Sequence, residues 1–159
     1  MRDILRQAQD ERGWVDCCLK KKRPVQAALA GLDRWLRSGR PPASARPLQL
    51  ATGGRPGVAP SLAKDANGLA LGGVRTPWVD VPIARLAGEG DPASFIGMLA
   101  GVTEPFDKAR LARLYPGGKA DYLARFTRAL DRAIRAKHIL PETRQEILDI
   151  AAINFDAAA

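Results

Sequence analysis

Apolar residues recur at spacings of three and four along two stretches of this chain, which flank a middle part rich in glycine and proline. In the first stretch the apolar positions are Val25, Ala28, Leu29, Leu32, Trp35 and Leu36. This periodicity is typical of an amphipathic helix. Pro24 suits the first helical turn, and Gly39 followed by Pro41 interrupts the pattern. We therefore predict a helix over residues 24–38.

The last part of the chain shows the same periodicity. Four-residue intervals in a second stretch connect Tyr122, Phe126, Leu130 and Ile134. They predict a long helix over residues 119–137. A shorter helix is expected before this long helix. Asp107 is placed to cap its start, and Pro116 and the two glycines after it are expected to end it. A final helix is expected over residues 142–155, so that the whole chain after residue 94 is expected to be helical.

The middle part favours turns and short extended segments. Asp65-Ala66-Asn67-Gly68 has the composition of a tight turn, around which residues 63–64 and 69–71 are predicted to pair as an antiparallel hairpin. Another extended segment is expected within residues 79–86. Long loops are expected around residues 41–61 and 87–94, which are rich in proline, glycine, serine and alanine. The fold class that follows is mainly α with a short antiparallel β-hairpin.

One segment directly after the hairpin has an unusual composition. It reads Gly72-Gly73-Val74-Arg75-Thr76-Pro77-Trp78-Val79-Asp80-Val81-Pro82. Glycines permit backbone angles that other residues resist, and each proline restricts its own φ and its predecessor, so the segment is expected to hold one shape. We predict a structural or cleft-lining loop formed by Gly72, Gly73, Arg75, Thr76, Pro77, Trp78 and Asp80. Burial of Trp78 and an Arg75–Asp80 ion pair are expected to hold it.

The chain is basic, with a formal net charge of +8. A basic excess favours acidic partners such as nucleic acid. On the long predicted helix, one face carries Arg125, Arg128, Arg132 and Arg135. This arginine stripe is either an anion-binding surface or a solvated face partly paired with Asp121 and Asp131. No aromatic residues interleave with it, so nucleic acid is not the partner that we expect.

Residues for hydrolytic or metal chemistry are sparse. A serine hydrolase of the α/β type carries its nucleophile in a Gly-x-Ser-x-Gly turn, and none of the four serines has those flanking glycines. The one histidine, His138, lies between two predicted helices and is expected to be a turn or surface residue. Cys17 and Cys18 are expected to be free thiols, or one of them to have a partner elsewhere, because neighbouring cysteines form a strained disulfide. No catalytic residue, metal site or cofactor is predicted.

The ends of the chain differ from its centre. Residues 1–23 form a polar, charged lead, which is either a short solvated helix or the translation of an intergenic repeat and so not native to the protein. Residues 157–159 are a short tail, and residues 24–156 form the predicted domain. Neither a signal peptide nor a membrane span is recognisable, so we expect a soluble, cytoplasmic protein.

Several ordered blocks resemble a large bacterial family, the alpha/beta hydrolase domain proteins, near their C-terminal end. These blocks are residues 27–36, 67–82, 101–107, 114–116, 121–122 and 139–141. The most specific is Asn67 to Pro82, and the similarity covers roughly Arg23 to Ala152. It implies a partial hydrolase fold whose central sheet, serine turn and remaining triad lie upstream, so that no residue here inherits a catalytic role.

Two functional hypotheses follow. In the first, the chain is a C-terminal fragment of a carboxylic-ester-hydrolase-like protein, inactive alone, whose partner is the missing N-terminal hydrolase portion. Truncation or a frameshift is the expected origin, and an exposed apolar surface is the expected consequence. In the second, it is a small basic binding module for an anionic partner such as nucleic acid.

Overall fold

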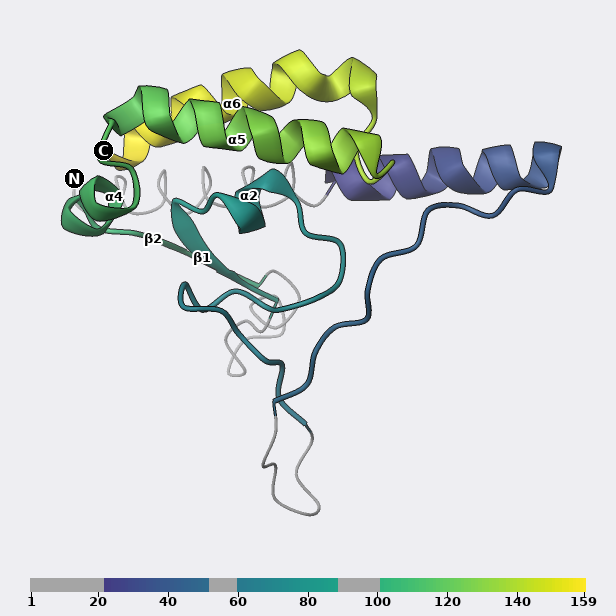
Figure 1. Cartoon of the computed structure of the whole chain (residues 1–159), viewed down its shortest axis with the longest axis horizontal. Coiled ribbons are helices and arrows are strands. Elements are labelled where there is room, and N and C mark those ends of the chain that lie inside the picture. The colour runs from purple at the N-terminus through teal and green to yellow at the C-terminus, as the bar shows by residue number, and fades with distance from the viewer. Residues whose placement is uncertain (1–21, 52–59, 89–100) are drawn as a thin grey trace, which may run out of the picture.

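The computed structural model describes residues 22–51, 60–88 and 101–159. Two long helices lie side by side and cover a short helix and a small sheet (Figure 1). The labelled elements are α2 (Pro77–Asp80), β1 (Ala84–Ala87), β2 (Val102–Pro105), α4 (Lys108–Leu114), α5 (Gly118–Arg135), the 3-10 turn η1 (Pro141–Thr143) and α6 (Arg144–Ala158). The described chain is thus mostly helical, as predicted, and its two-stranded antiparallel sheet is formed by β1 and β2 and not by the predicted hairpin.

The core lies between α5, α6 and α2. The predicted apolar face of α5 is confirmed, because Tyr122, Phe126 and Leu130 are completely buried. The Tyr122 ring stacks on Phe155 of α6 with 4.8 Å between centroids. The Phe126 ring meets Trp78 of α2 edge-on at 5.7 Å. Such aromatic contacts add to the stabilisation that burial of these large rings provides.

Helix α4 begins as its sequence predicts. The Asp107 side chain accepts a hydrogen bond from the backbone N–H of Arg110, at 2.7 Å from Oδ1. This bond satisfies one of the N–H groups that a first helical turn leaves without a partner. Leu111 then packs into the core, and the helix ends before Pro116.

The C-terminal end of α5 is set by an unusual residue. The backbone N–H of His138 donates to the carbonyl of Ala133, and that of Lys137 donates to Ile134. These two bonds define a Schellman motif, in which the residue after the cap takes a left-handed conformation. Here that residue is Lys137, with φ 62°, where glycine is the usual choice. The helix therefore ends at Arg135, and His138 has a fixed backbone position.

The two-stranded sheet corrects one prediction. Residues 102–105 were expected in a helical region, and they form β2, which pairs with β1 in the register Arg85 opposite Glu104. These two side chains also form a cross-strand ion pair, with 2.7 Å between Nε and Oε2. The Arg85 hydrogen bond lowers the pKa of Glu104. Pairing with a distant strand, and not local propensity, makes this segment extended.

The hairpin predicted around Asp65–Gly68 is present as a single antiparallel bridge between Lys64 and Ala70. The backbone N–H of Asp65 donates to the Leu69 carbonyl at 2.8 Å. The extended segment expected within residues 79–86 begins only at Ala84, because Pro77–Asp80 forms α2. Pro77 occupies the first turn of this short helix, where its missing N–H costs nothing.

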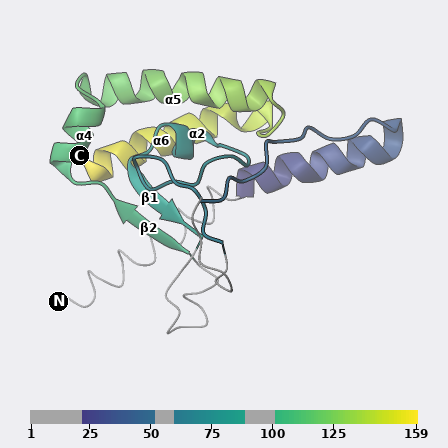
Figure 2. The ribbon, with the colours of Figure 1, turned by 60° about the horizontal axis from the view of Figure 1, so that its bottom comes forward.

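The first helix, over residues 22–38, is confirmed, but its apolar stripe faces solvent. Val25 is 56% exposed, Leu29 61% and Leu36 88%. The helix contacts the body through its opposite side, where Arg23 and Ala27 are buried. Its C-terminal half extends away from the other helices in both views (Figures 1 and 2). The expected exposed apolar surface is therefore present, and this helix carries most of it.

Predictions for residues 1–21, including both cysteines, and for most of the loop 87–94 lie outside the described residues. The final helix begins two residues later than predicted, after η1, and continues to Ala158. No helix in the described ranges is both long and apolar enough to cross a membrane.

Candidate binding cleft

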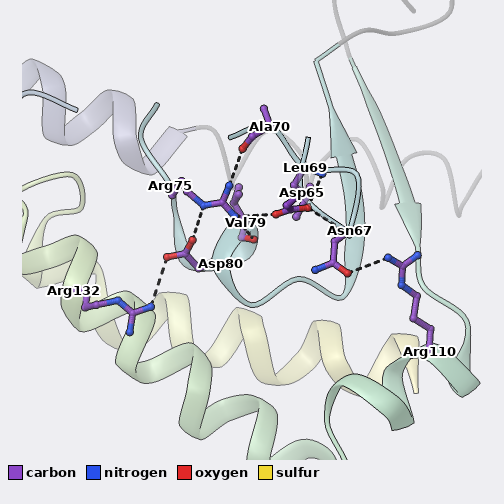
Figure 3. Close-up of polar contacts among 9 residues, drawn as sticks. All are labelled: Asp65, Asn67, Leu69, Ala70, Arg75, Val79, Asp80, Arg110 and Arg132. Atoms are coloured by element: carbon purple, nitrogen blue, oxygen red, sulfur yellow. Dashed lines mark hydrogen bonds and ion pairs between the residues drawn. The ribbon is translucent and has the colours of Figure 1, made fainter. Parts of the chain in front are cut away.

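The segment Gly72–Asp80 is organised around Arg75 (Figure 3). The Arg75 guanidinium donates to Asp80 Oδ1 at 2.7 Å, to the Ala70 carbonyl at 2.7 Å and to Asp65 Oδ2 at 3.1 Å. The expected Arg75–Asp80 pair is thus present. A second backbone contact, to the Val79 carbonyl at 3.3 Å, connects the same side chain to α2. Because all these partners surround one guanidinium, Arg75 holds the hairpin and α2 in a fixed relation.

Electrostatics favour this arrangement. Partial burial works to lower the pKa of Arg75, but the hydrogen bonds to Asp80 and Asp65 outweigh it and raise the pKa. The arginine is therefore charged at any physiological pH. Its donors are occupied by protein partners, so we assign it a structural role.

Asp65 extends the network to a third element. Its Oδ1 accepts from the backbone N–H groups of Asn67, at 2.9 Å, and Leu69, at 3.0 Å. This is the turn geometry for which aspartate is well suited. Asn67 Oδ1 in turn accepts from Arg110 at 3.0 Å (Figure 3). The hairpin is thereby connected to α4.

The glycine pair of this segment supports a strap, which we define as residues 44–49. Gly72 has φ 81°, and a Cβ built there would lie 2.1 Å from the Pro47 carbonyl oxygen. The backbone N–H of Gly73 donates to the Arg46 carbonyl at 2.8 Å. A side chain at residue 72 is excluded by both the backbone angle and the strap. The two glycines therefore allow the strap to lie directly on the segment.

An open cleft of about 500 Å³ lies between the strap, the glycine segment and the C-terminal half of α5. The residues around it are Ser44, Ala45, Arg46, Gln49, Leu71, Gly72, Gly73, Arg75, Asp80, Ala129, Arg132, Ala133, Ala136 and His138. Four of the seven predicted loop residues, Gly72, Gly73, Arg75 and Asp80, thus line a cleft. Whether this is a substrate cleft remains a prediction.

The other three predicted loop residues do not line the cleft and are buried in the protein. Thr76, Pro77 and Trp78 are buried, and none of them lines the cleft. Trp78 is 4% exposed and belongs to the core, where the apolar burial expected for it is present. Its indole Nε1 has no hydrogen-bond partner in the described part of the chain.

The arginines of the stripe on α5 differ in the residues that they contact. Arg125 makes a bidentate pair with Asp121, with both distances 2.7 Å. Arg132 approaches Asp80 Oδ2 at 3.6 Å and lines the cleft (Figure 3). Asp131, which was expected to pair with the stripe, accepts a hydrogen bond from Arg144 of α6 at 2.8 Å and interacts electrostatically with Arg135 of the stripe. That hydrogen bond lowers the pKa of Asp131.

The remaining stripe residues, Arg128 and Arg135, are exposed, and neither forms an ion pair with a described residue. The four guanidinium groups therefore have different surroundings. Two carboxylates form ion pairs with members of the stripe, so it is not a continuous row of available cations.

His138 is the residue whose setting the sequence did not indicate. Its backbone is fixed by the Schellman motif, and the residue is half-buried and lines the cleft. Its Nε2 is buried and lacks a hydrogen-bond partner within the described ranges. Nothing in the sequence indicated that the strap would border the same cleft, because residues 44–49 have no helical or strand periodicity. The left-handed Lys137 becomes recognisable only once the helix end is known.

The described residues that line the cleft do not form an arrangement typical of hydrolysis or metal binding. Ser44 and His138 both line it, but no hydrogen bond between them is present. Among the described residues no three histidine, cysteine or acidic side chains gather in a way that could hold a metal ion. The polar side chains among the lining residues are those of three arginines, Ser44, Gln49, Asp80 and His138.

Comparison with known protein families matches residues 18–149 to the family described as alpha/beta hydrolase domain. The match includes the glycine segment, the strap and most of the helical core. Neither a curated protein nor a solved structure matches the chain. Because the family match covers most of the sequence, the chain belongs to the alpha/beta hydrolase domain family.

Proposed function

We propose that this chain is the C-terminal part of a carboxylic-ester-hydrolase-like protein and has no hydrolytic activity by itself. Its helices complete the fold of the hydrolase, and its glycine segment forms a wall beside the substrate cleft. The partner in this proposal is an N-terminal portion that carries the central sheet and the Gly-x-Ser-x-Gly turn. The sequence supports this view, since none of its serines lies in such a turn.

The observation that carries the proposal is the orientation of the first helix. Its apolar stripe, with Val25, Leu29, Trp35 and Leu36, is 46% to 88% exposed. A helix with an apolar stripe gains stability by packing that stripe against another apolar surface. In an alpha/beta hydrolase the available surface is the face of the central sheet, which helices cover on both sides.

Complementation tests this proposal. The chain is co-expressed with the upstream part of a full-length family member, and hydrolysis of p-nitrophenyl acetate is measured for each part and for the mixture. We expect activity only when both parts are present. Activity of the chain alone would overturn the proposed inactivity, and no activity in a soluble, co-purifying complex would overturn the proposed role.

Two variants of the first helix sharpen this test. Leu29→Gln changes the exposed stripe, and Arg34→Gln changes an exposed polar position of the same helix. Leu29→Gln should weaken complementation, because it removes apolar contact area, and Arg34→Gln should leave it intact. Equal effects of the two variants would show that the stripe is not the contact surface.

The origin of the chain is tested separately. Translation of the DNA immediately upstream in all frames should show a Gly-x-Ser-x-Gly turn interrupted by a stop or a frameshift. Unrelated upstream sequence would contradict the fragment hypothesis and favour the basic binding module. That second hypothesis predicts a salt-dependent nucleic-acid gel shift that Arg128→Gln with Arg132→Gln abolishes. No shift at low salt would exclude it.

A further inference from the structure

We propose that the cleft beside α5 is a binding site for a small organic carboxylate. In this site the carboxylate lies between Arg132, Arg46 and His138, and its apolar body lies on the alanine side chains of α5. The inference concerns this chain alone and does not depend on the proposed hydrolase function, because each group that it uses is present in the described structure.

The first argument is the presence of cations with unused donors. Among the described residues the Arg132 side chain forms an ion pair with Asp80 alone, at 3.6 Å, and it is 56% exposed. Arg46 is exposed on the strap, and its side chain forms no ion pair with a described residue. The planar guanidinium group offers parallel N–H donors that match the two oxygens of a carboxylate. Two such groups at one cleft favour an anionic ligand.

The second argument is His138. The residue is one of those that line the same cleft, and its buried Nε2 has no hydrogen-bond partner in the part of the chain that the structure describes. A buried polar atom without a hydrogen bond destabilises a protein, and such atoms are usually satisfied by another group or a ligand. A ligand oxygen in the cleft would supply the missing partner.

The third argument concerns the apolar lining, which distinguishes an organic acid from an inorganic anion. The apolar lining residues include Leu71 of the hairpin and three alanines of α5 and its cap, of which Ala136 is exposed and Ala129 and Ala133 are almost completely buried. Small-molecule sites combine such an apolar lining with a few placed polar groups. The small side chains leave room for a ring or a short alkyl group.

One acidic residue also lines the cleft, and its charge is compensated. Asp80 Oδ1 accepts from Arg75 at 2.7 Å, and Oδ2 lies 3.6 Å from Arg132. Since Arg75 keeps its hydrogen bond to this carboxylate, the Arg132 side chain can move to a ligand without leaving the charge of Asp80 uncompensated. Among the described lining residues the arginines outnumber the acids by three to one.

An NMR titration of the full chain tests the proposal with three compounds: sodium benzoate, its neutral analogue benzamide, and sodium phosphate. We expect benzoate to shift the backbone signals of Gly73, Arg132 and His138 in a saturable way. Benzamide and phosphate should bind at least about tenfold more weakly, because each lacks one of the two features that the cleft recognises.

Three results would overturn the proposal. A benzoate shift that does not saturate would mean no site. Equal binding of benzamide would mean that the arginines take no part, and equal binding of phosphate would mean that the apolar lining takes no part.

Variants give an independent readout. Arg132→Gln should weaken benzoate binding by about tenfold, the effect of losing a charged hydrogen bond, whereas Arg128→Gln on the same helix should not change it. Arg46→Gln, on the exposed strap, gives the same test if Arg132→Gln perturbs folding. Benzoate affinity that neither Arg132→Gln nor Arg46→Gln changes would place the ligand elsewhere.

Discussion

The C-terminal helices and the first helix have similar apolar periodicity in the sequence, but their apolar stripes differ in solvent exposure in the structure. The stripe of α5 is buried, with Tyr122, Phe126 and Leu130 completely covered, whereas the stripe of the first helix faces solvent. The difference teaches that periodicity predicts a helix and its apolar side, but not the surface that covers this side. In α5 the cover is α6 and α2, and for the first helix we propose that it belongs to the N-terminal hydrolase portion.

The largest expected effect comes from truncating a core ring. Phe126→Ala should lower the free energy of unfolding by about 3 to 5 kcal/mol, because the change leaves a cavity in a packed core. Leu29→Ala, on the exposed stripe, should change it by no more than about 0.5 kcal/mol. Urea unfolding followed by circular dichroism measures both. Equal losses would show that the first helix is as well packed as α5.

The next effect concerns the strap. Gly72→Ala should destabilise the protein by about 2 to 4 kcal/mol, since it combines a left-handed backbone with a clash against the strap. The matched control is Gly39→Ala, which has a similar φ of 67° but no atom within 4 Å of the added Cβ. The control should cost only about 1 to 2 kcal/mol. If both variants lose the same stability in urea unfolding, the strap does not lie on the segment.

A pH-dependent effect is expected from Tyr115 in the core. Burial raises its pKa from 10.0 to about 12, and its hydroxyl donates to the Pro82 carbonyl at 2.8 Å. The unfolded chain loses this proton near pH 10 and the folded protein near pH 12. The stability that Tyr115 contributes is therefore present below pH 10 and is lost as the pH rises from 10 to 12, by up to about 2 to 3 kcal/mol.

Tyr115→Phe isolates this contribution. At neutral pH the variant should be less stable by about 1 kcal/mol, the value of one hydrogen bond. Between pH 10 and 12 its stability should fall less steeply than that of the unchanged protein in urea unfolding. Parallel pH profiles would mean that Tyr115 does not titrate differently in the folded state.

The smallest expected effect is a gain. Lys137→Gly should stabilise the protein by about 0.5 to 1 kcal/mol, because glycine adopts the left-handed angle at the end of α5 without a steric penalty. Thermal unfolding measures the gain, and Lys119→Gly, near the start of the same helix, should be destabilising in parallel. A loss of stability in Lys137→Gly would contradict the Schellman motif.

Local signals predicted much of the fold. The Asp107 cap, the apolar face of α5 and the hairpin turn at Asp65 depend on neighbouring residues, and the structure confirms them. Strand β2 was missed because its extended form depends on β1, which lies outside its sequence neighbourhood. Helix α2 was missed because four residues are too few to show periodicity.

The cleft was predicted only in part. The composition of Gly72–Asp80 indicated a rigid segment and an Arg75–Asp80 pair, because glycine, proline and opposite charges have local consequences. It did not indicate that Arg75 would also bind Asp65. It also did not indicate that the strap and His138 would line the same cleft. These contacts join segments far apart in the sequence, and no local pattern encodes them.

Hydrogen–deuterium exchange of the backbone amides tests the central claim most directly. It compares residues 22–38 with α5, first in the chain alone and then in a complex with the N-terminal portion of a full-length family member. The account predicts slow exchange in α5 in both states, and rapid exchange in the first helix that becomes slow in the complex. Slow exchange of the first helix in the isolated chain, or rapid exchange that the complex leaves unchanged, would contradict it.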